Sequence, residues 1–245
     1  MDLRAYPGGR VTANLPVRFL ITNAYATPLY AVIGGPAWIN SDRYSVEATP
    51  EADLGPGRRL QVLQGVLEER FQLKFHHETR ELPAYVLSPA KSGLKLPAVT
   101  DRDCTPVNRN DPLPPPPPDA NRFIVPCGRV VVNRSRSGLR LLGSKVPMEE
   151  FATVLSNIMG RAVIDKTEST GTFDPRLDFV PDQSEAGLPP EPPPPAAPGI
   201  PLPPIDPSGP SIFRALQDQL GLRLESAKGP VDVLVIDHVE RPSEN

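Results

Sequence analysis

Proline is the feature that most restricts how this chain can fold, because 34 of its 245 residues are proline and most of them are clustered. One cluster extends over 97–126 and the other over 187–210. Proline has no N–H to donate to a β-ladder and its φ angle is fixed, so such runs favour extended polyproline II over helices and central strands. We therefore expect both clusters to form linkers or surface loops outside the hydrophobic core.

The clusters divide the chain into a predicted domain organisation. We expect a first α+β unit at 1–98, a proline-rich linker at 99–126, and a second α+β unit at 127–245 that is interrupted by a proline-rich loop at 187–210. Amphipathic helices beside half-polar strands favour helices packed on mostly antiparallel sheets, which is the α+β class.

The composition of the whole chain excludes several classes of protein. Hydrophobic residues make up 39% and charged residues 22%, which argues against full disorder. The formal net charge of −3 provides no field that would attract nucleic acid, so no nucleic-acid partner is expected. No stretch of about 18 apolar residues is present, so we expect no transmembrane segment. The first residues show neither the basic nor the apolar region of an export signal, so no signal peptide is expected in the chain as given.

The hydrophobic pattern predicts helices that are each followed by strands. Apolar residues recur at helical spacing in four segments, which are 16–25, 60–70, 147–160 and 211–221. We expect Ser211 to cap the last helix and Gly221 to end it. Alternation predicts strands at 44–48, 173–179 and 222–224, a hairpin-like pair over 71–88, and, after a turn at Lys228-Gly229, an apolar strand at 231–239 that is central in its sheet.

Two parts of the sequence match at constant offsets. At an offset of 149 residues, Leu67, Phe71, Leu73 and Phe75 match Leu216, Leu220, Leu222 and Leu224. A weaker match at an offset of 131 relates Pro16, Val17 and Leu20 to Pro147, Met148 and Phe151. We interpret the matches as an internal duplication of a helix–strand–helix–hairpin unit. The alternative is that any two amphipathic units of this kind look alike.

Two cysteines, Cys104 and Cys127, flank the first proline cluster, and their spacing fits no zinc motif. The residues alone leave two interpretations open. Either both are reduced thiols, or they form one disulfide in an oxidising compartment, which would close a loop of roughly 24 residues.

No pattern of catalytic residues, metal ligands or cofactor-binding residues is found. His76 and His77 are neighbours on a strand and point to opposite faces, so we interpret them as surface or edge-strand histidines rather than metal ligands. Asp174, Asp178 and Asp182 recur every four residues and are interpreted as one solvated strand face. Nucleophile-elbow, dinucleotide-binding and phosphate-loop motifs are missing, so we predict no catalytic residue, no metal and no cofactor.

Trp38 is the single tryptophan and lies in the sequence Gly-Gly-Pro-Ala-Trp. Packing in the core or against a loop is the first interpretation of this residue. The second is an aromatic anchor for a partner, because tryptophan is enriched at binding hot spots. Trp38 is therefore the candidate partner-binding residue.

Four stretches of the sequence are distinctive, namely 35–44 and 67–85, together with parts of 160–174 and 216–243. They resemble an acidobacterial paralogous family of uncharacterised proteins, domain of unknown function 3738, over nearly the whole chain. The resemblance implies an exported protein with an extracytoplasmic location, periplasmic or secreted, and relatives in which such domains are joined to membrane-bound sensor-type metallopeptidases. It implies no known activity and no catalytic residues. The cysteines fit a family-like pattern, so the resemblance favours the disulfide between Cys104 and Cys127.

These observations favour a non-enzymatic extracytoplasmic module for interaction or sensing that binds a protein or peptide. The sheet edges and the groove between the two copies are the expected surfaces, and strand addition is the expected mode of binding. The alternative is a hydrolase-type enzyme whose site is assembled between the two units.

Overall fold

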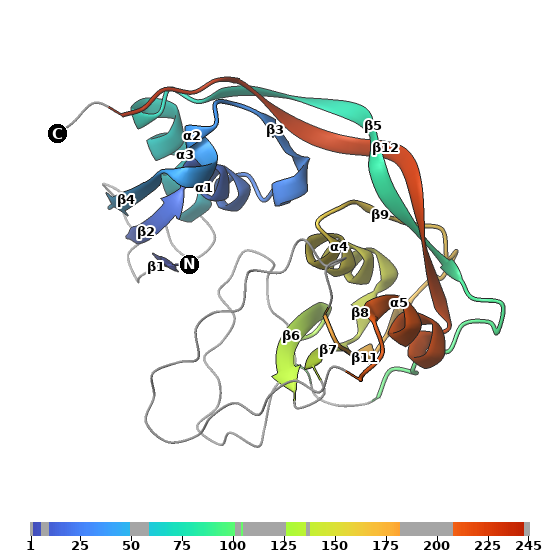
Figure 1. Cartoon of the computed structure of the whole chain (residues 1–245). Coiled ribbons are helices and arrows are strands. Elements are labelled where there is room, and N and C mark those ends of the chain that lie inside the picture. The colour runs from blue at the N-terminus through green and yellow to red at the C-terminus, as the bar shows by residue number, and fades with distance from the viewer. Residues whose placement is uncertain are drawn as a thin grey trace. The chain divides into compact units, whose positions relative to one another are not determined.

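The computed structural model describes residues 2–5, 10–49, 59–100, 104, 126–135, 138–181 and 208–242. The predicted linker at 99–126 and the predicted loop at 187–210 lie almost entirely outside these residues. The described part contains helices together with antiparallel and mixed sheets, which confirms the α+β class (Figure 1).

The chain forms two compact units, and each has its own hydrophobic core. Unit 1 contains the described residues up to Leu82 and from Pro230 onward, and unit 2 contains the described residues from Pro83 to Gly229. The prediction divided the chain at the proline clusters. The compact units instead divide within two long strands, β5 (Lys74–Pro89) and β12 (Leu222–His238), which lie side by side (Figure 1). Each long strand therefore contributes one part to each unit.

Unit 1 combines a three-stranded antiparallel sheet, in the order β1-β2-β4, with helices. Before β5, its elements are β1 (Asp2–Ala5), β2 (Val11–Pro16), α1 (Val17–Ala24), the 3-10 turn η2 (Leu29–Ala31), β3 (Val32–Gly34), α2 (Trp38–Ser41), β4 (Arg43–Ala48) and α3 (Arg59–Arg70). Pro16 ends β2 and leads directly into α1, where apolar residues at helical spacing are buried in the core of this unit.

Unit 2 has the same kind of sheet, in the order β6-β7-β11, with β8 and β10 as a short additional pair. Before β12, its elements are β6 (Arg129–Ser135), β7 (Gly138–Ser144), β8 (Val146–Pro147), α4 (Met148–Met159), β9 (Val163–Asp165), β10 (Thr172–Phe173), β11 (Arg176–Phe179), α5 (Ile212–Ala215) and the π-helical turn η3 (Leu216–Leu220). Helix α4 starts after Pro147 and ends at Gly160, which has a left-handed φ of 62°.

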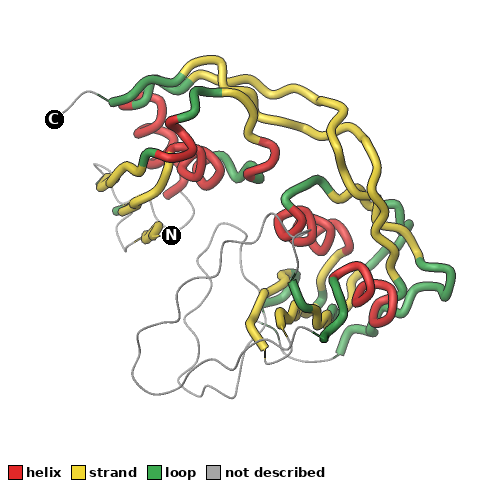
Figure 2. The backbone as a smooth tube through the Cα atoms, in the orientation of Figure 1, coloured by secondary structure: helices red, strands yellow, loops and turns green. Residues whose placement is uncertain are grey.

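The two units share one topology, in which a strand, a helix, a short parallel strand, an antiparallel strand and a second helix precede a long strand (Figure 2). Strand β3 pairs with β12 at Val32↔Leu234, and β9 pairs with β5 at Val163↔Tyr85. The offset between Val32 and Val163 is 131 residues, and that between Tyr85 and Leu234 is 149. The offsets in the sequence therefore relate residues that have the same pairing partners in the two units. That the units arose by duplication stays a prediction.

Two predictions are wrong at the long strands, namely the hairpin-like pair over 71–88 and the turn at Lys228-Gly229. Residues 74–89 and 222–238 are instead single continuous strands. Pro83 is compatible with its strand because of its position at an edge. The N–H of Tyr85 donates to Ala162 O at 2.8 Å on the β9 side, and Pro83, two residues earlier, faces the same side before β9 begins.

Two local predictions about the last helix have different outcomes. Ser211 precedes α5 but makes no side-chain capping hydrogen bond, so its predicted capping role is wrong. Gly221 does end the helical segment, with a left-handed φ of 64°. A Cβ at this position would lie 2.0 Å from the carbonyl oxygen of Gly93 and 2.8 Å from the nitrogen of Lys95, so only glycine fits there.

We predict that Gly221→Ala lowers the free energy of unfolding by about 2–3 kcal/mol. The left-handed backbone disfavours alanine by about 1–2 kcal/mol, and displacing Lys95 would break its hydrogen bond to Leu220 O, which contributes about 1 kcal/mol. Denaturant unfolding measures the change. Gly65→Ala is the control, because no atom lies within 4 Å of the added Cβ in the middle of α3, and it should stabilise the chain by about 1 kcal/mol. Equal stability of Gly221→Ala and the wild type would contradict the close approach.

Candidate functional site

A groove in unit 1 lies between strand β4 and the last turn of helix α3, and we call it the edge groove. Its cavity volume is about 230 Å³. This is smaller than the roughly 300–1,000 Å³ of small-molecule sites and suits one or two side chains of a larger partner. The groove is lined by Tyr44, Ser45, Val46, Glu47, Val66, Arg70, Phe71 and Pro242.

The groove exists because β4 is the last strand of its sheet. Alternation along β4 turns Tyr44 and Val46 toward the core, where both are partly buried, and leaves Ser45 and Glu47 exposed. The inner wall is aromatic, since the ring of Tyr44 packs edge-to-face against buried Phe71 with centroids 5.1 Å apart. Within the described residues, β4 has a strand partner only on the β2 side.

The segment after β12 closes one end of the edge groove. Glu240 donates its N–H to the carbonyl oxygen of Phe71 at 2.8 Å, which fixes the segment to the end of α3. The guanidinium of Arg241 lies over the ring of Trp38, 5.3 Å from the centroid, and forms an ion pair with Asp42 at 2.8 Å. These contacts position Pro242 in the groove lining.

Trp38, the predicted partner-binding residue, lies beside the groove rather than in its lining. It starts α2, is partly buried, and packs edge-to-face on Tyr44 with centroids 5.9 Å apart. Trp38 and Phe71 therefore both contact the ring of one groove residue, Tyr44. Its role as an anchor for a partner stays a prediction, and packing accounts for the contacts that the structure shows.

In unit 2 the segment after β5 lies at the place that corresponds to the edge groove, as Glu240 and Pro242 after β12 lie at the edge groove in unit 1. Tyr44 pairs with Leu15 in unit 1, and Phe173 pairs with Val146 in unit 2. Because Leu15 and Val146 match at the offset of 131, Tyr44 and Phe173 are corresponding residues. Asp174, which follows Phe173, donates its N–H to Pro97 O at 3.3 Å. The segment 95–100 after β5 therefore contacts the edge that corresponds to β4 at Asp174.

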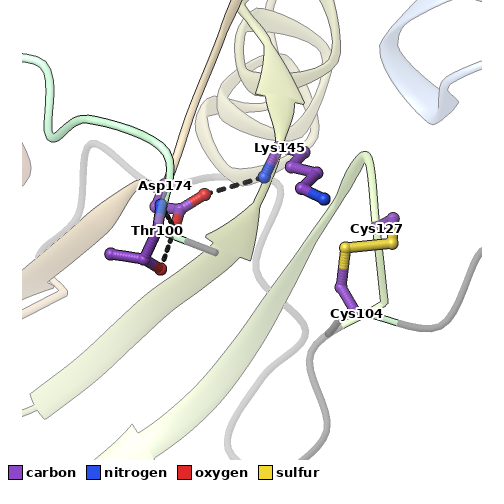
Figure 3. The surroundings of a disulfide bond; sticks show 5 residues. All are labelled: Thr100, Cys104, Cys127, Lys145 and Asp174. Carbon is purple, nitrogen blue, oxygen red and sulfur yellow. Dashed lines mark hydrogen bonds between the residues drawn. A yellow bond between two sulfur atoms is a disulfide. The ribbon is translucent and has the colours of Figure 1, made fainter. Parts of the chain in front are cut away.

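Further contacts hold this segment in place, as Figure 3 shows for Asp174. One carboxylate oxygen of Asp174 accepts the N–H of Thr100 at 2.9 Å and its hydroxyl at 2.7 Å, and the other accepts the N–H of Lys145 at 2.8 Å. Lys95 donates its N–H to Leu220 O at 2.9 Å, and Leu96 packs against the core of unit 2.

The rest of the outer edge in unit 2 is also hydrogen-bonded. The side-chain amide of Gln219 accepts the N–H of Asp178 at 3.0 Å and donates to its carbonyl at 2.8 Å, which imitates a neighbouring strand. Val180 donates to Pro210 O at 2.9 Å. The residue of unit 1 that matches Gln219 at the offset of 149 is Arg70, near the end of α3. An arginine side chain only donates hydrogen bonds, so it cannot accept a backbone N–H from the edge strand as Gln219 does.

The predicted solvated face of Asp174, Asp178 and Asp182 is wrong for its first two members. Asp174 lies between β10 and β11, in a break of the strand predicted at 173–179, and accepts the hydrogen bonds given above. Asp178 lies in β11, is half-buried, and pairs with Arg140 and Arg176. Asp182 lies outside the described residues. The two carboxylates are therefore partly buried and hold neighbouring segments of unit 2 together.

His76 and His238 pair with carboxylates on the surface, while His77 is exposed and its ring packs edge-to-face against Phe75. His76 Nδ1 lies 2.9 Å from Asp237 Oδ1, and its Nε2 lies 3.7 Å from Glu78, while His238 lies 2.9 Å from Glu240. The hydrogen bond to Asp237 is the main reason why the pKa of His76 is raised above its ordinary value of 6.5, and the negative charges of Asp237 and Glu78 act in the same direction. In the described part of the chain, no group of three or more His, Cys, Asp or Glu residues is arranged to hold a metal ion.

Cys104 and Cys127 form a disulfide in unit 2 (Figure 3). Their sulfur atoms are 2.05 Å apart and their Cα atoms 5.0 Å apart. Cys127 forms an isolated bridge with Ser144, at the end of β7, so the bond attaches Cys104 to the sheet of unit 2. Of the helices described, none is long and apolar enough to cross a lipid bilayer.

The chain belongs to a family whose model is described as "Protein of unknown function (DUF3738)" and matches residues 18–239. This result agrees with the resemblance for the domain, and the acidobacterial origin is not tested by it. No curated protein and no solved structure matches the chain significantly.

We predict that replacing Asp237 with asparagine lowers the pKa of His76 toward 6.5, because the charged acceptor is removed. A pH titration followed by NMR of the histidine ring measures the change. Folding raises this pKa, so the stability that the contact contributes is complete below the unfolded pKa of 6.5 and is lost as the pH rises through the folded-state pKa. Asp232→Asn is the control, because Asp232 bonds to Thr79 instead. An unchanged titration in Asp237→Asn would show that the contact is absent in solution.

We also predict that replacing both cysteines with serine lowers the free energy of unfolding by about 3 kcal/mol. The bridge joins residues 23 apart, and the cost follows from the larger freedom of the unfolded chain. Denaturant unfolding of the oxidised wild type and the variant measures the loss. Reduction of the wild type is the control and should cause a loss of similar size. A variant as stable as the oxidised protein would contradict this role.

Proposed function

We propose that this member of the DUF3738 family is a non-enzymatic, extracytoplasmic module that binds an extended segment of a protein or peptide in the edge groove of unit 1. The observation that supports the proposal best is the apolar edge groove beside β4, which has a strand partner on one side only within the described residues. In unit 2 the matching edge is contacted by the chain's own segment, since Asp174 donates its N–H to Pro97 O.

The mode of binding follows from the backbone of β4. Every second residue of an edge strand turns its N–H and C=O away from the sheet, and these groups hydrogen-bond to a strand that is added. Strand addition obtains its affinity from such bonds and its specificity from pockets for alternate side chains. The cavity beside Tyr44, Val66 and Phe71 is the pocket that this mode requires.

The location outside the cytoplasm is supported by the disulfide. Disulfides persist in oxidising compartments and are rare in the cytosol of most organisms. Cys104 and Cys127 are bonded to each other, so the chain has no free cysteine. Mass spectrometry of the protein isolated from its native host without reduction tests this part, and two free thiols would overturn it.

We predict that Val66→Lys weakens peptide binding roughly tenfold or more, which corresponds to about 1.4 kcal/mol. The lysine would place a long charged side chain in the apolar part of the groove. The measurement uses the oxidised full chain and a library of capped linear peptides, with affinities from calorimetry and protection of the β4 amides from hydrogen exchange.

Val62→Lys is the matched control for this experiment. Val62 lies one turn earlier on α3 and is also partly buried against the core, but it does not line the groove. It should therefore cost similar stability and leave peptide affinity unchanged. Equal weakening by both variants, or no binding of any peptide to the wild type, would contradict the proposal. Turnover of a substrate that is abolished by changes in this groove would overturn the non-enzymatic assignment.

A further inference from the structure

We infer that the segment 240–242, which we call the strap, inhibits the edge groove of unit 1 by covering the start of β4, and that its release admits the peptide. This inference rests on the proposed function and specifies how that site is regulated. It is carried by the contacts that hold the strap in unit 1 and by a contact that only the corresponding segment of unit 2 makes.

The strap begins at the helix side of the groove. Glu240 donates its N–H to Phe71 O at 2.8 Å, as Lys95 donates its N–H to Leu220 O at 2.9 Å in unit 2. In both units a proline follows two residues after the donor. The two segments therefore correspond to each other, residue by residue, from the donor to this proline.

The next backbone contact is present only in unit 2, where Pro97 accepts the N–H of Asp174 and Thr100 bonds to the carboxylate of Asp174. Ser45 is the counterpart of Asp174 in β4, since each follows one of the two corresponding aromatic residues. Pro242 lines the groove together with Ser45, yet among the described residues no backbone hydrogen bond joins Pro242 to β4. The strap is therefore bonded at the helix side and not at the strand side, so it is easier to displace than the segment of unit 2.

Arg241 is the residue that holds the strap at the start of β4. Its guanidinium lies 5.3 Å from the centroid of the Trp38 ring and 2.8 Å from a carboxylate oxygen of Asp42. Asp42 directly precedes β4, so these contacts bring the strap to the first residues of that strand. The side chain of Arg241 is 61% exposed, and an exposed ion pair contributes little to stability and weakens in salt. The strap can therefore open without unfolding of the unit.

The strap covers backbone groups that strand addition needs. The N–H of Asp174 points away from its sheet, so the backbone of its counterpart Ser45 also turns outward. Alternation gives Arg43 the same orientation, which agrees with its partner Pro16, because proline has no N–H to donate across that pair. A peptide that pairs with Arg43 and Ser45 must pass the place where Pro242 lines the groove. Strap and peptide therefore compete, and the apparent affinity of the peptide is reduced in proportion to the fraction of molecules with an open strap.

The test measures the strap and the peptide separately on the oxidised full chain. Hydrogen exchange of the Glu240 amide reports release of the strap, because this N–H is bonded to Phe71 O only while the strap is closed. Calorimetry reports the affinity of an uncharged, capped peptide that has been selected from the library. The peptide carries no charge, so a charge removed from the protein does not act on it directly.

We expect Arg241→Ala to speed exchange of the Glu240 amide and to tighten peptide binding, each roughly fivefold or more. Asp42→Asn removes the ion pair from the other side, so it should act in the same direction and add nothing to Arg241→Ala in the double variant. Arg223→Ala is the matched control, because Arg223 forms an exposed ion pair with Glu225 in the part of β12 that belongs to unit 2. It should change neither quantity.

The outcomes separate this inference from the proposed function. Unchanged protection of Glu240 in Arg241→Ala would show that Arg241 does not hold the strap and would overturn the inference. Faster exchange with unchanged or weaker peptide binding would overturn the inhibition and leave the peptide-binding module standing. If the Glu240 amide is released but no peptide binds the wild type or either variant, the proposed function fails and the inhibitory role fails with it.

Discussion

The pairing of β5 with β12 is the interaction on which the rest of the structure depends. Each of these strands starts after the second helix of one unit, at Lys74 or Leu222, and ends in the other unit, where it pairs with a short parallel strand. Leu87 and Leu234 are fully buried in the parts of the strands that cross over. Neither core would therefore be complete without a strand that begins in the other half of the chain. We infer that the two cores depend on each other for stability, although each is compact.

An edge strand needs a partner for its outward backbone groups, and the two units meet this need differently. In unit 2 the chain continues after β5, and Pro97, Gln219 and Pro210 satisfy the edge of β10 and β11. In unit 1, Glu240 after β12 donates its N–H to Phe71 O as Lys95 donates to Leu220 O in unit 2, and Pro242 lines the edge groove. Unpaired edges favour association with other chains. The segments after the two long strands make an equivalent contact, and the units differ at the outer edge, where Gln219 bonds to Asp178 in unit 2 and Arg70 is its counterpart in unit 1.

The parts of the fold that could be predicted are those where a local pattern and the tertiary environment agree. Helices α1, α3 and α4 were predicted within a few residues, because their apolar stripes face a core and Gly160 ends α4 in the left-handed region. The long strands were not predicted, because Pro83 and Gly229-Pro230 are local turn signals. Their effect is overridden by pairing between residues such as Thr79 and Asp232, which are 153 positions apart. A local sequence pattern cannot predict a pairing between residues so far apart in the chain.

The edge groove illustrates the same limit and also a signal that the sequence does contain. Tyr44, Val66, Phe71 and Pro242 were not singled out as site residues, because a groove of apolar side chains has no motif. The offset of 149 nevertheless relates Phe71 to Leu220, whose carbonyl oxygens accept equivalent hydrogen bonds from Glu240 and Lys95, and a proline follows two residues after each donor. A comparison of the two matching segments in the sequence therefore relates Phe71 of this groove to a residue that holds an adjacent segment in unit 2. The spacing between each matched residue and its donor differs, which is why the offset alone did not relate Glu240 to Lys95.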